Sequence, residues 1–265
     1  MSKAALAEVA RLYYLRDLTQ QEIAIRLGVS RFKVLRLLEQ ARAEGVVRFE
    51  IDGVVPEHDE LSVALEEHFG LTQAHVADDV AGAAAAVLPQ LLTADDVLGV
   101  AWGETLAAIS ERLPPLETAI PVVQICGAIE GLEPGTGPTA LAARFAAKAG
   151  GPFHPLEAPA VANERALRRA VKPTTTMFEK VTIALVGIGA RSDGTGHLLV
   201  HVFDRDGRIV SHERSIALSV KQLSRTRVVA AAGGRAKRDA TLGALRTGLI
   251  DVLVTDPVCA RHALA

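Results

Sequence analysis

LTQQEIAIRLGVSRFKVLRLL, residues 18–38, decides how the N-terminal region of this chain folds. Thr19 is followed three residues later by Glu22, which is the pattern of a capping box at the start of a helix. Gly28 ends that helix, because glycine readily adopts the left-handed backbone of a helix C-terminus. Ser30 is a favourable N-cap for the next helix. The stretch therefore predicts a short helix, a tight turn and a second helix.

The flanking residues complete a helix-turn-helix. Residues 5–16 carry apolar side chains at three- and four-residue spacing, which predicts an amphipathic helix before the capping box. The helix after Ser30 should bury Val34, Leu37, Leu38 and Ala41 and present its basic residues on the other side. A charged helical face is more often a solvated surface, but the capping box, glycine turn and serine cap in register favour insertion into the major groove of DNA. The predicted DNA contacts are Thr19, Gln20, Ser30, Arg31, Lys33 and Arg36.

Charge is distributed unevenly along the chain. The 265 residues have a formal net charge of −2. Residues 1–50 carry nine Lys and Arg against six Asp and Glu, whereas the other residues carry 20 against 25. A basic N-terminal region on an acidic remainder predicts that only the N-terminal region meets a polyanion, here double-stranded DNA.

A domain boundary follows the basic region. Residues 46–51 alternate between apolar and polar, which predicts a strand that could be the wing of a winged helix. Asp52 and Gly53 form a turn signal, and Pro56 ends the module. The sequence thus predicts a winged helix-turn-helix over residues 1–52, a linker over 53–58 and a larger domain over 59–265, which opens with a helix over 59–69.

The larger domain has the pattern of an α/β fold. Short, continuous apolar runs alternate with helical stretches, which predicts a Rossmann-like parallel sheet covered by helices on both faces. In such sheets ligands bind beyond the carboxyl ends of the strands, where the runs lead into glycine-bearing loops. A hairpin made of residues 198–203 and 209–210 is expected at an edge of the domain. The predicted strands are 97–101, 121–126, 181–186, 228–232 and 252–254.

Two of the loops suit an anionic ligand. Each combines glycine, which lets the backbone approach a ligand closely, with the start of a helix, whose free amides attract anions. A lone Gly-x-Thr is more often a tight turn, and a lone lysine is more often solvated. Their shared position at one sheet edge nevertheless favours a site for a sugar phosphate or sugar acid. The candidate residues are Gly103, Glu104, Thr105, Gly233, Gly234 and Lys237.

Asp256 and Trp102 each leave two interpretations open. Asp256 directly follows the last predicted strand and precedes a proline, so it could bind a sugar hydroxyl or cap the final helix. Trp102, the only tryptophan, could pack against a ligand or line the core.

Several classes of site and partner are not expected. The two cysteines, Cys126 and Cys259, lack CxxC spacing and the eight histidines lack ligand spacing, so we expect no metal and no cofactor. Residues 1–17 contain no continuous hydrophobic segment of the kind that export signals have. The most apolar stretch, 81–92, is too short to cross a bilayer. These features predict a reduced, cytoplasmic protein without a membrane partner.

The chain resembles the SorC family of bacterial transcriptional regulators, sometimes grouped as SorC/DeoR. The resemblance covers nearly the whole chain in the order of the family's motifs. It is carried by residues 13–51 and by GVAWGETL (99–106), VVQICGA (122–128), LVGIG (185–189), VFDRDGRIV (202–210) and AAGGRAKRDATLGALRTGLIDVLVTD (231–256). The segment between Gly189 and Gly196 is shorter than is usual in the family.

The resemblance implies a function and a set of site residues. It implies a winged helix-turn-helix joined to an effector domain related to sugar-phosphate isomerases. A sugar, polyol or sugar phosphate bound there would change the affinity of a homotetramer or homodimer for operator DNA. By matching motif positions, the effector site would be lined by Gly103, Thr105, the loop at Gly127, Lys237 and Asp256.

An enzyme is the alternative function. Asp193-Gly194 and Gly196-His197 are faintly similar to the Asp-Gly-His loop of sugar-phosphate deaminases, in which an acid/base pair acts on an aldose. Here Thr195 separates the two pairs, and the neighbouring catalytic carboxylates are not recognisable. Because acid/base catalysis needs groups within hydrogen-bond reach of each other, the regulator is preferred and no catalytic residue is assigned.

Overall fold

A computed structural model describes residues 3–47, 56–129, 131–132, 134–160, 176–211 and 216–265. The chain divides into two compact units, Met1–Val54 and Val55–Ala265. We refer to them as the N-terminal unit and the C-terminal unit. Within the described ranges, no helix is both long and apolar enough to cross a membrane.

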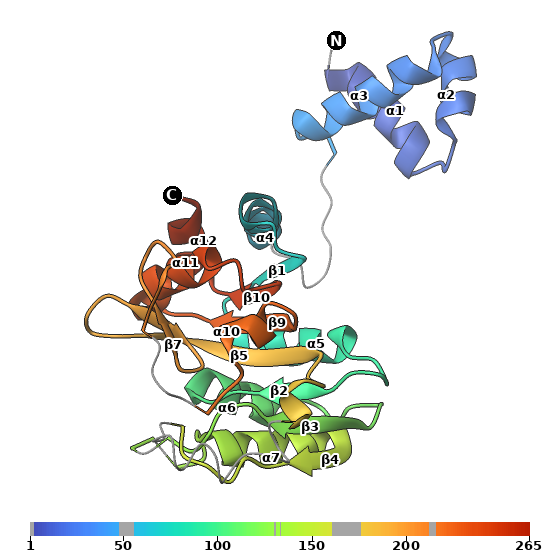
Figure 1. Cartoon of the computed structure of the whole chain (residues 1–265). Helices are drawn as coiled ribbons and strands as arrows, with labels where there is room; N and C mark the ends of the chain where they lie inside the picture. Colours follow the sequence, from blue (N-terminus) through green and yellow to red (C-terminus); the bar gives the residue numbers. More distant parts are fainter. Residues whose placement is uncertain (1–2, 48–55, 130, 133, 161–175, 212–215) are drawn as a thin grey trace. The chain divides into compact units, whose positions relative to one another are not determined.

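The N-terminal unit contains the three predicted helices, α1 (Lys3–Tyr14), α2 (Gln20–Leu27) and α3 (Arg31–Ala43) (Figure 1). Thr19 and Glu22 form the predicted capping box, and Gly28 ends α2 in the left-handed conformation with φ of 64°. The Ser30 side chain accepts a hydrogen bond from the Lys33 amide at 3.2 Å and so caps α3. The local signals in the sequence are therefore confirmed.

A compact apolar core holds these helices together. The four residues predicted to face inward from α3 are all buried and pack against α1 and α2. Burying a valine or leucine side chain completely stabilises the fold by roughly 1.5–3 kcal/mol. The predicted wing strand falls largely on residues 48–51, which lie outside the described residues. The buried core residues are Leu6, Val9, Ala10, Leu12, Ile23, Ala24, Val34, Leu37, Leu38 and Ala41.

The C-terminal unit is built on the predicted parallel sheet. Seven strands run parallel in the order β1-β10-β9-β5-β2-β3-β4. The interior strands β2, β9 and β10 are buried over almost their whole length, which explains their continuous apolar sequences. Their bounds are β1 Gln73–Val76, β2 Leu98–Val100, β3 Ile120–Gln124, β4 Gly150–His154, β5 Ile183–Ala190, β9 Arg227–Ala232 and β10 Val252–Thr255.

Helices cover both faces of the sheet (Figure 1). Helices α5, α6 and α7 pack side by side on one face, and α4, α12 and α11 pack on the other. The helix predicted from residue 59 begins at Pro56, so residues 56–58 belong to α4 and not to a linker. The helices are α4 Pro56–Phe69, α5 Val80–Leu91, α6 Glu104–Arg112, α7 Pro138–Ala149, α10 Val220–Leu223, the 3-10 helix η1 Arg235–Lys237, α11 Arg238–Arg246 and α12 Pro257–Leu264.

An antiparallel arm extends the sheet from β5. The prediction that the strand gives way to a loop at Gly187 is wrong, because β5 continues to Ala190. Its last residues pair with β6 (Gly196–Leu198), which pairs with β7 (His201–Phe203), which pairs with β8 (Ile209–Ser211). The β6 strand supplies the hydrogen bonds that keep this glycine-containing segment extended. The predicted hairpin is thus β7 and β8, and Leu198 belongs to β6.

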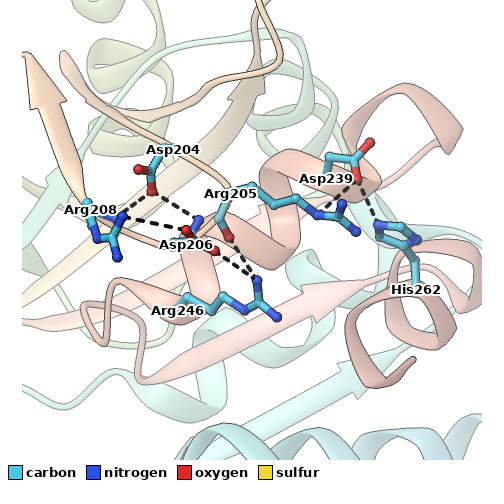
Figure 2. A network of polar contacts seen from close by, with 7 residues as sticks. All are labelled: Asp204, Arg205, Asp206, Arg208, Asp239, Arg246 and His262. Atoms are coloured by element: carbon cyan, nitrogen blue, oxygen red, sulfur yellow. Dashed lines mark hydrogen bonds and ion pairs between the residues drawn. The ribbon is translucent and has the colours of Figure 1, made fainter.

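The turn between β7 and β8 is fixed to helix α11 (Figure 2). Gly207, with φ of 81°, approaches the backbone of Arg246 so closely that a Cβ would lie 2.4 Å from its carbonyl carbon. Arg246 Nη1 donates to the carbonyl oxygen of Arg205 at 3.2 Å and pairs with Asp206 at 3.7 Å. Asp239 joins Arg205 to His262 of α12, with contacts of 3.7 and 2.9 Å. These contacts hold the arm against the helices that follow β9 and β10.

Candidate functional site

The exposed side of α3 is the first candidate site. Arg31, Lys33 and Arg36 are all exposed, as predicted, on a helix whose opposite side is buried. Arg31 Nε donates to Gln20 Oε1 at 3.5 Å, which links the beginnings of α2 and α3. An exposed basic helix end next to a second helix N-terminus has the charge and amide donors that bind a phosphate backbone.

Thr19 has a structural role in the described unit. Its Oγ1 donates to the Glu22 carboxylate at 2.8 Å and accepts from the Glu22 amide at 3.2 Å. The Thr19 amide also donates to that carboxylate at 2.8 Å. The hydroxyl that was predicted to contact phosphate is therefore engaged in the capping box. Gln20 is half-buried and accepts from Arg31, whereas Lys33 and Arg36 are exposed.

The second candidate site lies at the switch point of the sheet. The chain proceeds outward from β2 through β3 and β4, and in the opposite direction from β5 through β9 and β10. A crevice opens at the carboxyl ends of adjacent strands where the strand order reverses in this way. A cavity of about 320 Å³ lies there. Its lining residues are Ala101, Trp102, Gly103, Glu104, Thr105, Gly131, Leu132, Thr136, Gly187, Ile188, Gly189, Ala190, His197, Leu199 and Lys237.

Lys237 brings a positive charge into this cavity. Its Nζ donates to Thr105 Oγ1 at 3.1 Å, and the side chain is half-buried. Burial lowers the pKa of Lys237, while the Glu104 carboxylate opposes that effect. Among the described residues, no carboxylate forms an ion pair with Lys237. The cavity therefore holds a partly desolvated cation whose charge a bound anion could neutralise.

The start of α6 adds amide donors to the same cavity. Gly103 is its N-cap, with φ of 118°, and no side chain caps the helix. The Gly103 amide donates to the Thr136 carbonyl at 3.0 Å, which fixes the loop. Free amides and the helix dipole make an uncapped helix N-terminus favourable for a negatively charged group. Gly103, Glu104, Thr105 and Lys237 are thus the predicted effector residues that the structure brings together.

His197 and Trp102 form one wall of the cavity. Their rings stack with centroids 5.3 Å apart and planes 12° apart. His197 Nδ1 lies 3.2 Å from the Leu199 carbonyl oxygen, so the neutral ring carries its proton on Nδ1. Burial is the main cause that lowers the pKa of His197, and the charges of Arg191 and Lys237 lower it further. Histidine therefore enters the cavity as a neutral, flat surface.

Four predicted effector residues lie outside the lining of this cavity. Asp256 caps α12 by accepting from the Cys259 amide at 2.8 Å, and its other oxygen accepts from the Gly234 amide. The structure thus favours the helix-capping interpretation of Asp256. Gly127 serves packing, since a Cβ there would lie 2.5 Å from the Pro159 backbone. Gly233 and Gly234 form the turn that leads to Lys237.

The sequence reasoning missed the residues that β5 and the arm contribute. Gly187, Gly189 and Leu199 line the cavity because β5 continues past the sheet and pairs with β6. Leu199 is buried and has φ of 53°, a conformation that leucine rarely adopts. The glycines at the end of the predicted strand were a signal for these positions, but the pairing of β5 with β6 was not visible in the sequence.

The alternative acid/base pair does not form. Asp193 lies in an exposed turn, where its Oδ1 accepts from the Thr195 amide and hydroxyl at 3.0 and 2.6 Å. His197 instead faces the cavity. Among the described residues there is no group of three or more His, Cys, Asp or Glu that could hold a metal ion. Cys126 and Cys259 are free and buried, as predicted, and burial raises their pKa values to about 12 and about 11.

A basic helix-turn-helix joined to an α/β domain with a cavity at its switch point defines a ligand-responsive DNA-binding protein. A family model described as "Putative sugar-binding domain" matches residues 55–200 and 190–265. The chain therefore belongs to this sugar-binding family, and it is a transcriptional regulator of the SorC type.

Relatives of similar length support this conclusion. The deoxyribonucleoside regulator of Bacillus subtilis is 28% identical over 96% of this chain and 95% of its own length. The erythritol catabolism regulatory protein EryD of Brucella abortus is 28% identical over 93% and 92%. The crystal structure of the full-length sorbitol operon regulator SorC from Klebsiella pneumoniae has a TM-score of 0.72 and 25% identity, covering 99% of both chains. These proteins are regulators, so the predicted regulator is confirmed and the enzyme alternative is not favoured.

Proposed function

We propose that an anionic sugar derivative, a sugar phosphate or sugar acid, binds the switch-point cavity and thereby changes the affinity of the N-terminal unit for operator DNA. Half-buried Lys237, which has no ion-pair partner among the described residues, carries this proposal. Its Nζ and the uncapped N-terminus of α6 meet at Thr105, so a phosphate or carboxylate placed there would receive both a cation and amide donors.

The rest of the cavity suits the carbon skeleton of such a ligand. The stacked rings of Trp102 and His197 offer a flat apolar surface on which a carbon skeleton can pack. A few polar groups that converge in a mostly apolar cavity are the usual arrangement of small-molecule sites.

Recognition of DNA would use α3. Its N-terminal end would enter the major groove, where Arg31, Lys33 and Arg36 reach base edges and phosphates, with Ser30 and Gln20 next to the backbone. We further propose that the chain acts in the cytoplasm as a homodimer or homotetramer. Helix-turn-helix proteins gain operator affinity when two copies bind two half-sites, and an effector that favours one arrangement of copies would then change that affinity.

The effector site is tested by thermal unfolding of the full chain with pairs of phosphorylated and unphosphorylated sugars. A phosphorylated ligand at 100 times its Kd should stabilise the wild type by roughly 2.7 kcal/mol. Lys237→Met should abolish this shift, because the anion loses its cation. Lys221→Met, at an exposed lysine in α10, is the matched control and should keep the shift. Equal shifts in the two variants would contradict the proposed site.

The DNA site is tested by fluorescence anisotropy with duplex DNA over a range of salt concentrations. Affinity should fall linearly on a log–log plot, because phosphate contacts release counterions. Arg36→Ala should weaken binding, and it should lower the slope by about 1 if the contact is to phosphate. Arg225→Ala, at an exposed arginine of the C-terminal unit, should change neither quantity. No binding by the wild type at low salt would refute the DNA site.

A further inference from the structure

Phe32 is a large apolar side chain on the outside of the basic helix. It is 75% exposed, although Val34, two residues later, is completely buried. Single exposed apolar residues are common on protein surfaces, so exposure alone assigns no role to the ring. It shares α3 with only one other exposed large apolar residue of the described unit, Leu35, whereas Leu15, Ile25 and Leu27 lie outside that helix.

The ring lies in the middle of the positively charged surface of α3. Phe32 is the second residue of the helix, directly between exposed Arg31 and Lys33. Arg36 follows four residues later, so Phe32 and Arg36 share one face of the helix. That face is opposite the buried residues Val34 and Leu37. A negatively charged partner that binds this surface must also accommodate an aromatic ring.

The major groove of DNA offers one apolar group at its base edges, the C5-methyl group of thymine. A phenyl ring has neither a donor nor an acceptor that could read the other groups there. Leu35, which is 39% exposed, lies three residues after Phe32 and extends the apolar surface. The helix therefore combines cations for phosphates and guanine edges with an apolar surface for a methyl group.

A second copy of the chain is a less suitable partner for this ring. In a symmetric contact the same surface would be used on both copies. Arg31, Lys33 and Arg36 of one copy would then face the same three cations of the other, which disfavours association. Duplex DNA has the opposite charge and removes this repulsion.

We propose that Phe32 is a specificity-determining residue that contacts the methyl group of a thymine in each operator half-site. This inference rests on the proposed DNA-binding role of α3 and deepens it, because it assigns one base to one side chain. Phe32 reads sequence through apolar contact, whereas Arg31, Lys33 and Arg36 supply most of the affinity.

The test removes the methyl group from the DNA and the ring from the protein. Duplexes bound by the full chain are first selected from a random pool. Each thymine of the selected site is then replaced by deoxyuridine, which differs only in lacking the methyl group. One thymine in each half-site should be sensitive to this replacement. Replacing it should weaken the binding of the wild-type protein about fourfold, which is the value expected for burying one methyl-sized group. Phe32→Ala should bind thymine and uracil duplexes equally.

A matched control separates this effect from general loss of apolar surface. Leu15 is also 75% exposed but lies outside α3. Leu15→Ala should keep the fourfold preference for thymine. Because Phe32 is exposed, Phe32→Ala should also keep the fold, which the emission of Tyr13 and Tyr14 reports in a Trp102→Phe background.

The outcomes distinguish the inference from the function on which it rests. If Phe32→Ala keeps the preference for thymine, or if the wild type has none, the ring does not read a methyl group, while DNA binding by α3 stands. The same holds if the selected site lacks thymine, or if Phe32→Ala changes the oligomeric mass and not base preference. If the wild type binds no DNA even at low salt, the proposed function itself fails.

Discussion

The imidazole ring of His197 packs against Gly189 so closely that no larger residue fits at position 189. The two residues are directly paired between β5 and β6, and a Cβ on Gly189 would lie 1.9 Å from His197 Nε2. The ring can lie against the strand and stack on Trp102 only because Gly189 has no side chain. One glycine thus fixes one wall of the ligand cavity.

Gly189→Ala should therefore damage the cavity. The added methyl group must displace the imidazole, which should lower stability by about 1–3 kcal/mol and weaken effector binding. Urea unfolding monitored by fluorescence of Trp102, the only tryptophan, measures the first effect. Gly137→Ala is the control, because its φ of −72° is ordinary and a Cβ there meets nothing within 4 Å. Equal stability of the two variants would contradict this account.

His197 should also make stability depend on pH. Burial lowers its pKa in the folded state, so the unfolded chain binds a proton at higher pH than the folded chain does. The contribution is fully present above the unfolded pKa of about 6.5 and is lost as pH falls toward the folded pKa. His197→Gln should flatten the decrease in unfolding free energy between about pH 7.5 and about pH 5.5. Some dependence should remain, because burial also lowers the pKa of His75. If the unfolding free energy of His197→Gln decreases as steeply as that of the wild type, His197 is not the cause of the pH dependence.

At the scale of the elements, helices α2 and α3 each begin where a side chain satisfies a free backbone amide. Thr19 and Glu22 exchange hydrogen bonds at the start of α2. At the start of α3, the Ser30 hydroxyl accepts a hydrogen bond from the Lys33 amide. These contacts are local in sequence, so they predict the helix boundaries. In contrast, the extension of β5 depends on its pairing with β6.

Thr19→Ala should destabilise the N-terminal unit by about 1 kcal/mol, because the first amides of α2 lose their cap. Both tyrosines of the chain, Tyr13 and Tyr14, lie in this unit, so tyrosine emission in a Trp102→Phe background reports its unfolding alone. Gln21→Ala changes an exposed residue of the same helix and should have little effect. A loss of stability in Gln21→Ala as large as in Thr19→Ala would argue against the capping box.

At the scale of the whole molecule, the chain joins two units with separate cores. The N-terminal unit holds the basic surface, and the C-terminal unit holds the cavity with Lys237. An effector can change DNA affinity only if it binds the DNA-competent and the incompetent states with different affinity. The regulator function therefore requires a free energy of coupling between the two sites.

That coupling must be reciprocal. If a sugar phosphate changes operator affinity by some factor, about 5- to 150-fold in typical cases, operator DNA must change sugar phosphate affinity by the same factor. Quenching of Trp102 fluorescence, with and without saturating operator duplex, measures the second factor, and anisotropy measures the first. Lys237→Met should remove both. If the change in operator affinity and the change in sugar phosphate affinity differ, the ligand does not act through a linked binding equilibrium.

The sequence alone determined those features that depend on neighbours in the chain. The capping box at Thr19, the glycine turn at Gly28, the inward residues of α3 and the parallel α/β sheet all follow from local spacing and apolar patterning, which act over a few residues. Gly103, Thr105 and Lys237 could also be proposed, because loops after parallel strands meet at one edge of the sheet.

Tertiary structure decided which of these loops share a cavity. The strand order places β2 beside β5, so His197 and Leu199 of the arm meet Trp102, while Asp256 and Gly127 serve a helix cap and close packing. These outcomes depend on contacts between residues far apart in the chain, and only the packing of the sheet and helices brings such residues together.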